Sequence, residues 1–223
     1  DYLGVNVYLL SNIKRGERYN IQQTYWFDRY AIETKINSDI VESEYDRDTP
    51  LFRRYTGKNE YIPLDMEMLD SLLPSIVGRE RNPYEKARKI FAWVLEYLSY
   101  EDGPAQDDLK QVLELKRGNS YGYSILLTTL LRKAKIPARP LAGFIVYDDK
   151  QTARHFWSEF YLEGFGWLPL DPSLADGLTY GGFPTVQDPR SYYFGNIDSG
   201  HILVSRGVIP TSAIRPDSTL LQR

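Results

Sequence analysis

The sequence predicts an α+β domain in which one buried helix packs on an antiparallel sheet. The helix is expected over residues 120–134, where apolar side chains occur on nearly every side of the helical path. Three later segments, 139–147, 155–162 and 167–170, have the composition of strands. The Gly-rich turn at 163–166 predicts that the last two strands form a hairpin.

Bulk composition indicates an ordinary globular chain and argues against a nucleic-acid partner and against a membrane span. The chain has 223 residues, 42% hydrophobic and 26% charged, which is enough for one main domain and a smaller region. A net charge of -3, with no long basic run, argues against a nucleic-acid partner. No apolar stretch approaches the roughly 18 residues of a membrane span, so none is expected.

The chain contains no cysteine and begins at Asp1 rather than Met. The first fact excludes disulfides and thiolate metal sites, and two distant histidines suggest no metal site or cofactor either. The second suggests a processed or trimmed chain. Together they slightly favour an extracytoplasmic bacterial location.

Residues 1–64 are predicted to form a β-rich N-terminal region. Every second position in one segment holds a mostly large side chain, at Tyr19, Ile21, Gln23 and Tyr25. This alternation is typical of a half-buried strand. The region has no histidine or cysteine and its acidic residues are scattered, so we expect no catalytic group from it.

Two helices are expected to open the main unit, residues 65–207, which a C-terminal tail, 208–223, follows. Asp65 is a candidate N-cap for the first helix, and Asn82 with Pro83 is a stronger start signal for the second. The second helix repeats its apolar residues at helical spacing, at Ala87, Ile90, Phe91, Val94 and Leu98. A short acidic helix over residues 106–115 and a Gly-Asn turn then lead into the central helix.

Three sequence segments, GNSYGYS, HFWSE and GFGWLPLDP, together resemble the core of the transglutaminase-like superfamily, which shares the papain-like fold. In that family a cysteine opens the buried helix, a histidine opens one strand and an aspartate closes the next. Ser120, His155 and Asp171 hold those places here. The resemblance therefore implies an acyl-transfer framework, acting through a thioester on peptide or glutamine-type amides, with serine at the nucleophile position.

A thiol at a helix N-terminus is activated by the helix dipole and by a neighbouring imidazolium, while an aspartate orients the imidazole. A serine hydroxyl stays protonated near neutral pH and needs a base during the attack. We therefore expect Ser120 to leave an inactive or very weak site, through a natural change or an engineered Cys→Ser replacement. The alternatives are a module that binds a peptide or a cell-wall peptide without catalysis, and a Ser-His-Asp hydrolase.

Several residues also have structural interpretations. Ser120 could serve as an N-cap, and Asp171 before a proline could simply form a turn. Glu159 is expected to be an ion-pair partner, and His201, in a Ser-Gly-His sequence, a loop residue.

Two aromatic residues beside the triad could line a substrate cleft. Tyr121 follows the nucleophile position, and Trp157 lies two residues after the histidine. Either could equally be a packing residue, because large aromatic side chains are common in cores. A peptide or protein is the expected substrate or ligand.

Overall fold

The computed structural model describes residues 12–22, 24, 26, 28–103, 108–147 and 151–207. The predicted C-terminal tail and part of the predicted β-rich region lie outside these residues. Within the described ranges, no helix is long and apolar enough to cross a membrane.

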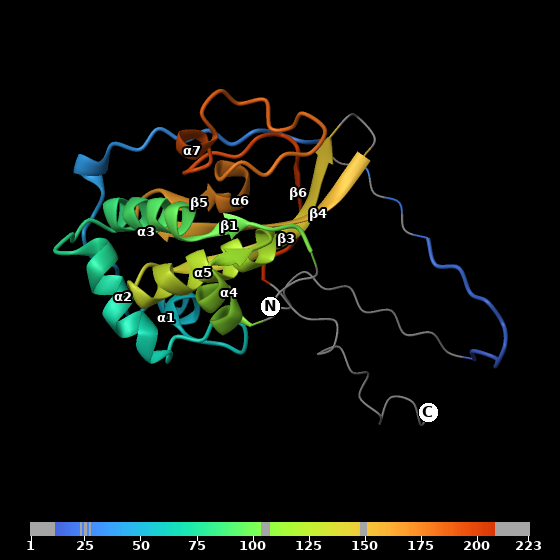
Figure 1. Cartoon of the computed structure of the whole chain (residues 1–223), viewed down its shortest axis with the longest axis horizontal. Helices are drawn as coiled ribbons and strands as arrows, with labels where there is room; N and C mark the ends of the chain where they lie inside the picture. Colours follow the sequence, from blue (N-terminus) through green and yellow to red (C-terminus); the bar gives the residue numbers. More distant parts are fainter. Residues whose placement is uncertain are drawn as a thin grey trace.

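A four-stranded antiparallel sheet forms the centre, in the order β5-β4-β3-β6 (Figure 1). The strands are β3 (Ala138–Tyr147), β4 (Gln151–Leu162), β5 (Gly166–Leu170) and β6 (His201–Ser205). The hairpin between β4 and β5 is confirmed, with Ser158 paired to Leu170 and Leu162 to Gly166. The turn residues Gly164 and Gly166 have φ of 78° and 89°, which glycine adopts without strain.

The helix α5 (Ser120–Lys133) packs on this sheet and is buried from Ser120 to Arg132. It ends near the predicted position and is followed by Ile136, also buried. The helix α3 (Pro83–Tyr97) lies beside it, and the Asn82 side chain accepts hydrogen bonds from the backbone N–H groups of Tyr84 and Glu85. The predicted cap and apolar stripe of this helix are confirmed.

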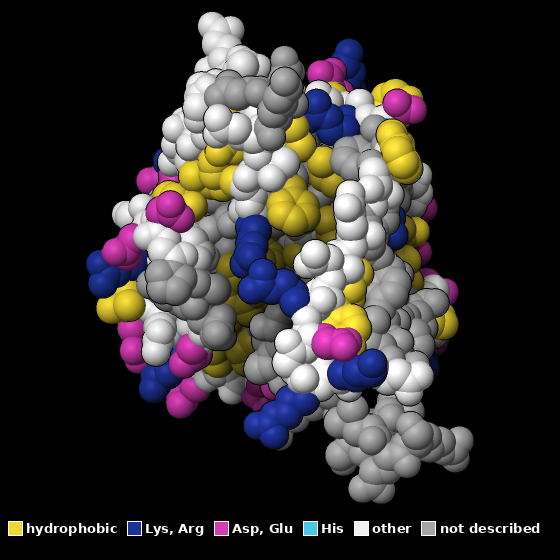
Figure 2. All heavy atoms as spheres, turned by 90° about the vertical axis from the view of Figure 1, so that its right-hand side faces the viewer, with side chains coloured by type: hydrophobic (Ala, Val, Ile, Leu, Met, Phe, Trp, Pro, Cys, Tyr) yellow, Lys and Arg dark blue, Asp and Glu magenta, His cyan; other side chains and the backbone are white. Residues whose placement is uncertain are grey.

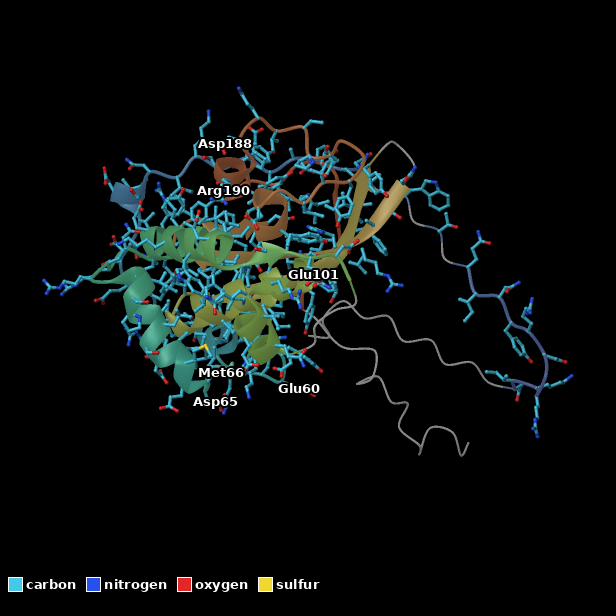
Figure 3. The ribbon with its side chains drawn as sticks, viewed as in Figure 1. Glu60, Asp65, Met66, Glu101, Asp188 and Arg190 are labelled. Carbon is cyan, nitrogen blue, oxygen red and sulfur yellow. The ribbon has the colours of Figure 1, made fainter. Side chains whose placement is uncertain are left out.

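The helix α2 (Glu67–Val77) begins later than expected, because Asp65 is not its cap. Met66 takes the N-cap position without a side-chain bond, and the Asp65 carboxylate instead pairs with Lys58 at 2.6 Å. Asp65 and Met66 are labelled in Figure 3. The Asp65 carboxylate, which the sequence predicted as the helix cap, thus pairs with the Lys58 ammonium group.

The described part of the N-terminal region contains no strand, so the β-rich prediction is wrong there. Thr49 and Pro50 start the helix α1 (Pro50–Thr56), with the Thr49 hydroxyl as cap. Upstream, Trp26 is 88% exposed and Tyr30 76% exposed. The extended segment drawn in blue in Figure 1 meets the body through an isolated bridge between Ile32 and Ile197. Among the described residues, this region therefore joins the body without a strand of its own.

The remaining elements are short and surround the sheet and α5. They are η1 (Ser38–Ile40), β1 (Ser99–Tyr100), α4 (Leu109–Leu115), β2 (Arg117–Gly118), α6 (Pro172–Ala175) and α7 (Pro189–Tyr192). Figure 3 labels Asp188 and Arg190 at α7, where the Asp188 side chain caps the helix. The Arg190 guanidinium joins α7 to Glu96 of α3 at 2.6 Å.

Candidate active site

The sheet brings His155 and Asp171 together. His155 lies on β4, and Asp171 follows the last residue of the neighbouring strand β5. The His155 Nε2 atom and the Asp171 Oδ2 atom are 2.5 Å apart, and both side chains are fully buried. Two of the three residues singled out in the sequence thus form a hydrogen-bonded pair.

The Asp171 carboxylate is fixed by its other oxygen as well. Its Oδ1 atom accepts hydrogen bonds from the Ser173 hydroxyl and from the Leu174 N–H, both at 3.0 Å. The second bond makes Asp171 the N-cap of α6, so the structural interpretation of this residue is also correct. Capping and pairing with histidine use different oxygens and therefore do not compete.

Ser120 is the first residue of α5, where the sequence predicted the nucleophile position. Its side chain is not the cap, because the Asn119 side chain accepts from the N–H groups of Tyr121 and Gly122. The Tyr121 ring meets the Phe156 ring edge-on at 5.3 Å. The first turn of α5 therefore lies beside the part of β4 that carries His155.

Alternation along β4 separates the side chains that contact α5 from the histidine. Ser158 on β4 meets Ser124 of α5 at 2.9 Å, and Phe156 has the same parity. His155 has the other parity, and its Nδ1 atom faces the Tyr180 hydroxyl at 3.4 Å. No hydrogen bond joins Ser120 to His155 within the described ranges, so the predicted facing of these two groups stays a prediction.

His201 is the site residue that the sequence analysis missed, and its assignment to a loop is wrong. It opens β6, and its side chain is only 3% exposed. Its Nε2 atom lies 3.0 Å from Asp171 Oδ2 and its Nδ1 atom 3.2 Å from Asp198 Oδ1. The apolar run that follows the histidine in sequence was the available signal for a strand, but nothing local indicated its partners.

The two histidines, distant in sequence, are neighbours in space. Their ligand atoms and that of Asp171 all lie within 4.8 Å of one another, which brings three potential metal ligands together. Both nitrogens, however, face the same carboxylate oxygen at hydrogen-bond distances. Two ligands of a tetrahedral zinc ion lie about 3.3 Å apart, given metal–ligand distances of about 2.0 Å. The 2.5 Å contact fits a hydrogen bond better, and we describe the cluster as a hydrogen-bonded chain.

Within this group of hydrogen-bonded side chains, the neighbouring charges favour ionised carboxylates and a protonated His201. Burial by itself would raise the pKa of Asp171, but His155 and His201 outweigh it and hold that pKa below its usual range. Burial would lower the pKa of His201, but hydrogen bonds to Asp171 and Asp198 outweigh it and raise the pKa to about 9. The Asp198 pKa is lowered too, since His201 outweighs burial.

The raised pKa of His201 predicts a stability change with pH. An unfolded histidine loses its proton near pH 6.5, whereas folded His201 keeps it to about pH 9. The stabilisation is therefore fully present below about pH 6.5 and is lost as the pH rises to about 9. The expected loss in the free energy of unfolding is about 3 kcal/mol. Urea unfolding at both ends of this range should show the loss in the parent and not in His201→Gln. The same pH dependence in both proteins would contradict the assignment.

The aromatic residues proposed for a substrate cleft are buried. Tyr121 is 9% exposed, and Trp157 is 3% exposed in a small cluster with Leu141 and Ile197. Their burial agrees with the packing alternative. Glu159 forms the predicted ion pair, with Arg139. No histidine reaches the surface on the face drawn in Figure 2, which agrees with the burial of both rings.

A pocket of about 290 Å³ borders the histidine cluster. Its lining includes Tyr147, whose ring stacks on Tyr180 at 5.5 Å, and Gly200, which precedes His201. The Tyr180 ring in turn meets the His155 ring edge-on at 6.1 Å. Tyr180 thus contacts both a lining residue of this pocket and His155.

Residues 70–172 match the core of the transglutaminase-like superfamily. This part of the chain belongs to that superfamily. The α+β class and the transglutaminase-like core expected from the three sequence segments are thereby confirmed. The matched range contains Ser120, His155 and Asp171.

Known relatives are distant and longer. An uncharacterized protein of Haemophilus influenzae is 23% identical over 211 residues, which cover 77% of this chain and 57% of that protein. The human kyphoscoliosis peptidase is 25% identical over 123 residues, covering 49% of this chain and 18% of the peptidase. The periplasmic domain of TgpA from Pseudomonas aeruginosa is a solved structure with 21% identity and a TM-score of 0.45, covering 58% of this chain and 48% of that domain. The chain thus spans between a fifth and three fifths of these relatives' lengths.

Proposed function

We propose that this chain is a transglutaminase-like acyl-transfer framework in which Ser120, His155 and Asp171 occupy the positions of a Cys-His-Asp triad. The single observation that supports this most is the buried hydrogen bond between His155 Nε2 and Asp171 Oδ2. With Nε2 bound to the carboxylate, Nδ1 is the nitrogen left to exchange a proton with a nucleophile. In the proposed framework Asp171 orients the ring, and Nδ1, which the Tyr180 hydroxyl faces at 3.4 Å, exchanges the proton.

Of the three proposed triad residues, Ser120 is the one least suited to its role, because its hydroxyl is a poor nucleophile. A hydroxyl is not ionised near neutral pH, so its attack on an amide requires His155 to remove the proton during the step. The geometry supplies no direct Ser120–His155 hydrogen bond within the described residues. We therefore propose that the protein as it stands has little or no acyl-transfer activity.

The proposed substrate is a peptide or protein amide, in which the carbonyl carbon would form a thioester in the cysteine form of the site. The human relative is named as a peptidase, which agrees with a peptide-type substrate. The pocket lined by Tyr147 and Gly200 offers about 290 Å³ for part of such a chain.

Turnover by Ser120→Cys tests this proposal. We expect the cysteine variant to hydrolyse a glutamine-containing peptide, or to transfer its acyl group to an amine, at least about a hundredfold faster than the parent. The reason is that a thiolate attacks without waiting for deprotonation in the same step. Ammonia release and mass spectrometry of the peptide measure both outcomes, and Asp171→Asn in the cysteine background should remove most of the gain.

Two results would replace the proposal. Ester or amide turnover by the Ser120 parent that exceeds that of the cysteine variant would identify a Ser-His-Asp hydrolase. No turnover by either protein, with saturable peptide binding to both, would identify a binding module.

A further inference from the structure

We propose that His201 is a positioning residue for this site: a buried imidazolium that shares the Asp171 carboxylate with His155 and so controls how the His155 ring is held and charged. The inference rests on the proposed function for its role in catalysis. Its structural basis is independent of any turnover, because it concerns one carboxylate oxygen that faces two imidazoles, at 2.5 Å and 3.0 Å.

Hydrogen bonding requires His201 to be charged. A neutral imidazole has one N–H group and one acceptor nitrogen. Both nitrogens of His201 face carboxylate oxygens, of Asp171 at 3.0 Å and of Asp198 at 3.2 Å. A neutral ring would turn a lone pair toward one of these anions, whereas an imidazolium donates to both. The pKa, raised to about 9 by these bonds despite burial, agrees with this assignment.

The second carboxylate is held in place by its own partners. Asp198 Oδ2 accepts from the Tyr193 hydroxyl and Asp198 Oδ1 from the Gly200 N–H, both at 2.7 Å. Tyr193 is fully buried, and its ring centroid is 6.2 Å from that of His201. The chain from His155 through Asp171, His201 and Asp198 to Tyr193 therefore has a defined partner at every step.

The charges that face His201 come from three elements. Asp171 follows β5, Asp198 precedes β6, and His155 on β4 has its ring centroid 5.7 Å away. Tyr193 supplies the titratable hydroxyl behind Asp198, while the Trp157 ring, 5.2 Å away, forms an apolar wall. In the described part of the chain, His201 is thus a cation between two anions and beside a second imidazole.

This placement has a direct consequence for His155. A protonated His155 would put a second cation next to His201 around a single Asp171 oxygen, and like charges disfavour each other. His201 therefore works against an imidazolium at His155 and favours the neutral base. A hydroxyl nucleophile at Ser120 requires that neutral form, whereas a thiolate–imidazolium pair requires the charged one. We therefore expect the charge on His201 to limit, without removing, the stabilisation that His155 gives to a thiolate at position 120.

Imidazole NMR tests the inference in the intact chain, because the sequence contains only two histidines. Side-chain ¹⁵N spectra from pH 5 to 10 should show one ring with both nitrogens protonated until about pH 9. In His201→Gln that signal should vanish, because the ring that carries both protons is His201.

Asp198→Asn provides a second variant that keeps the shape of the site. Without one of its two carboxylates, His201 should lose its proton at least about one pH unit lower than in the parent. A single neutral tautomer for both rings at pH 7 in the parent would overturn the inference. So would a doubly protonated ring that persists to about pH 9 in a folded His201→Gln protein. None of these readings uses turnover, so failure of the acyl-transfer proposal would leave the result separately interpretable.

Discussion

Replacing Ser120 by cysteine should create a thiol that ionises well below the usual pKa of about 8.5. The residue stands at the first position of the 14-residue helix α5, where the helix dipole favours an anion. His155, if it faces this position as proposed, adds to the effect. Ultraviolet absorbance of the thiolate should show a midpoint at least about one to two pH units below that of free cysteine.

Alkylation at pH 6 should accordingly be at least about tenfold faster than for a control thiol. The chain has no cysteine of its own, so every label reports the introduced residue. Ser71→Cys is the matched control, because Ser71 is exposed in the interior of α2 and away from any helix N-terminus. His155→Ala in the cysteine background should slow the labelling several-fold. An absorbance midpoint no lower than that of the Ser71→Cys protein would show that the site lacks thiol-enzyme electrostatics.

Gly143→Ala should destabilise the fold by about 3 kcal/mol or more. A Cβ atom at this position would lie 1.9 Å from the Ile202 carbonyl oxygen and 2.9 Å from the Trp157 ring. The first of these atoms belongs to backbone, so β3 and β6 would have to separate. Because Ile202 follows His201 in β6, the same displacement should loosen the hydrogen bond between His201 and Asp171.

Urea unfolding measures the change in free energy, with Gly103→Ala as the control. No atom lies within 4 Å of a Cβ built on Gly103, so that variant should stay within about 0.5 kcal/mol of the parent. A loss of less than about 1 kcal/mol in Gly143→Ala would show that β3 and β6 approach each other less closely than described. Imidazole spectra of the same variant would report whether His201 has moved.

Local sequence was sufficient for the elements whose signals lie within a few residues. Asn82 with Pro83 specified the start of α3, and the turn around Gly164 specified the hairpin, because caps and tight turns depend on neighbouring side chains and φ preferences. The apolar run of α5 specified a central helix, since only burial accommodates apolar side chains on every face.

Of the candidate site, too, one part could be predicted from local sequence and another part could not. His155 and Asp171 could be named from the sequence because they belong to segments that resemble a known family, and the hairpin between them is short enough to bring them together. Only the tertiary structure decided the place of His201, 30 residues after Asp171 on a strand that pairs with β3. It also decided that the described part of the N-terminal region forms no strand and that Asp65 pairs with Lys58 and does not cap α2. Strand pairing, burial and ion pairing join residues far apart in the chain, and a local pattern carries no information about which distant partner will be there.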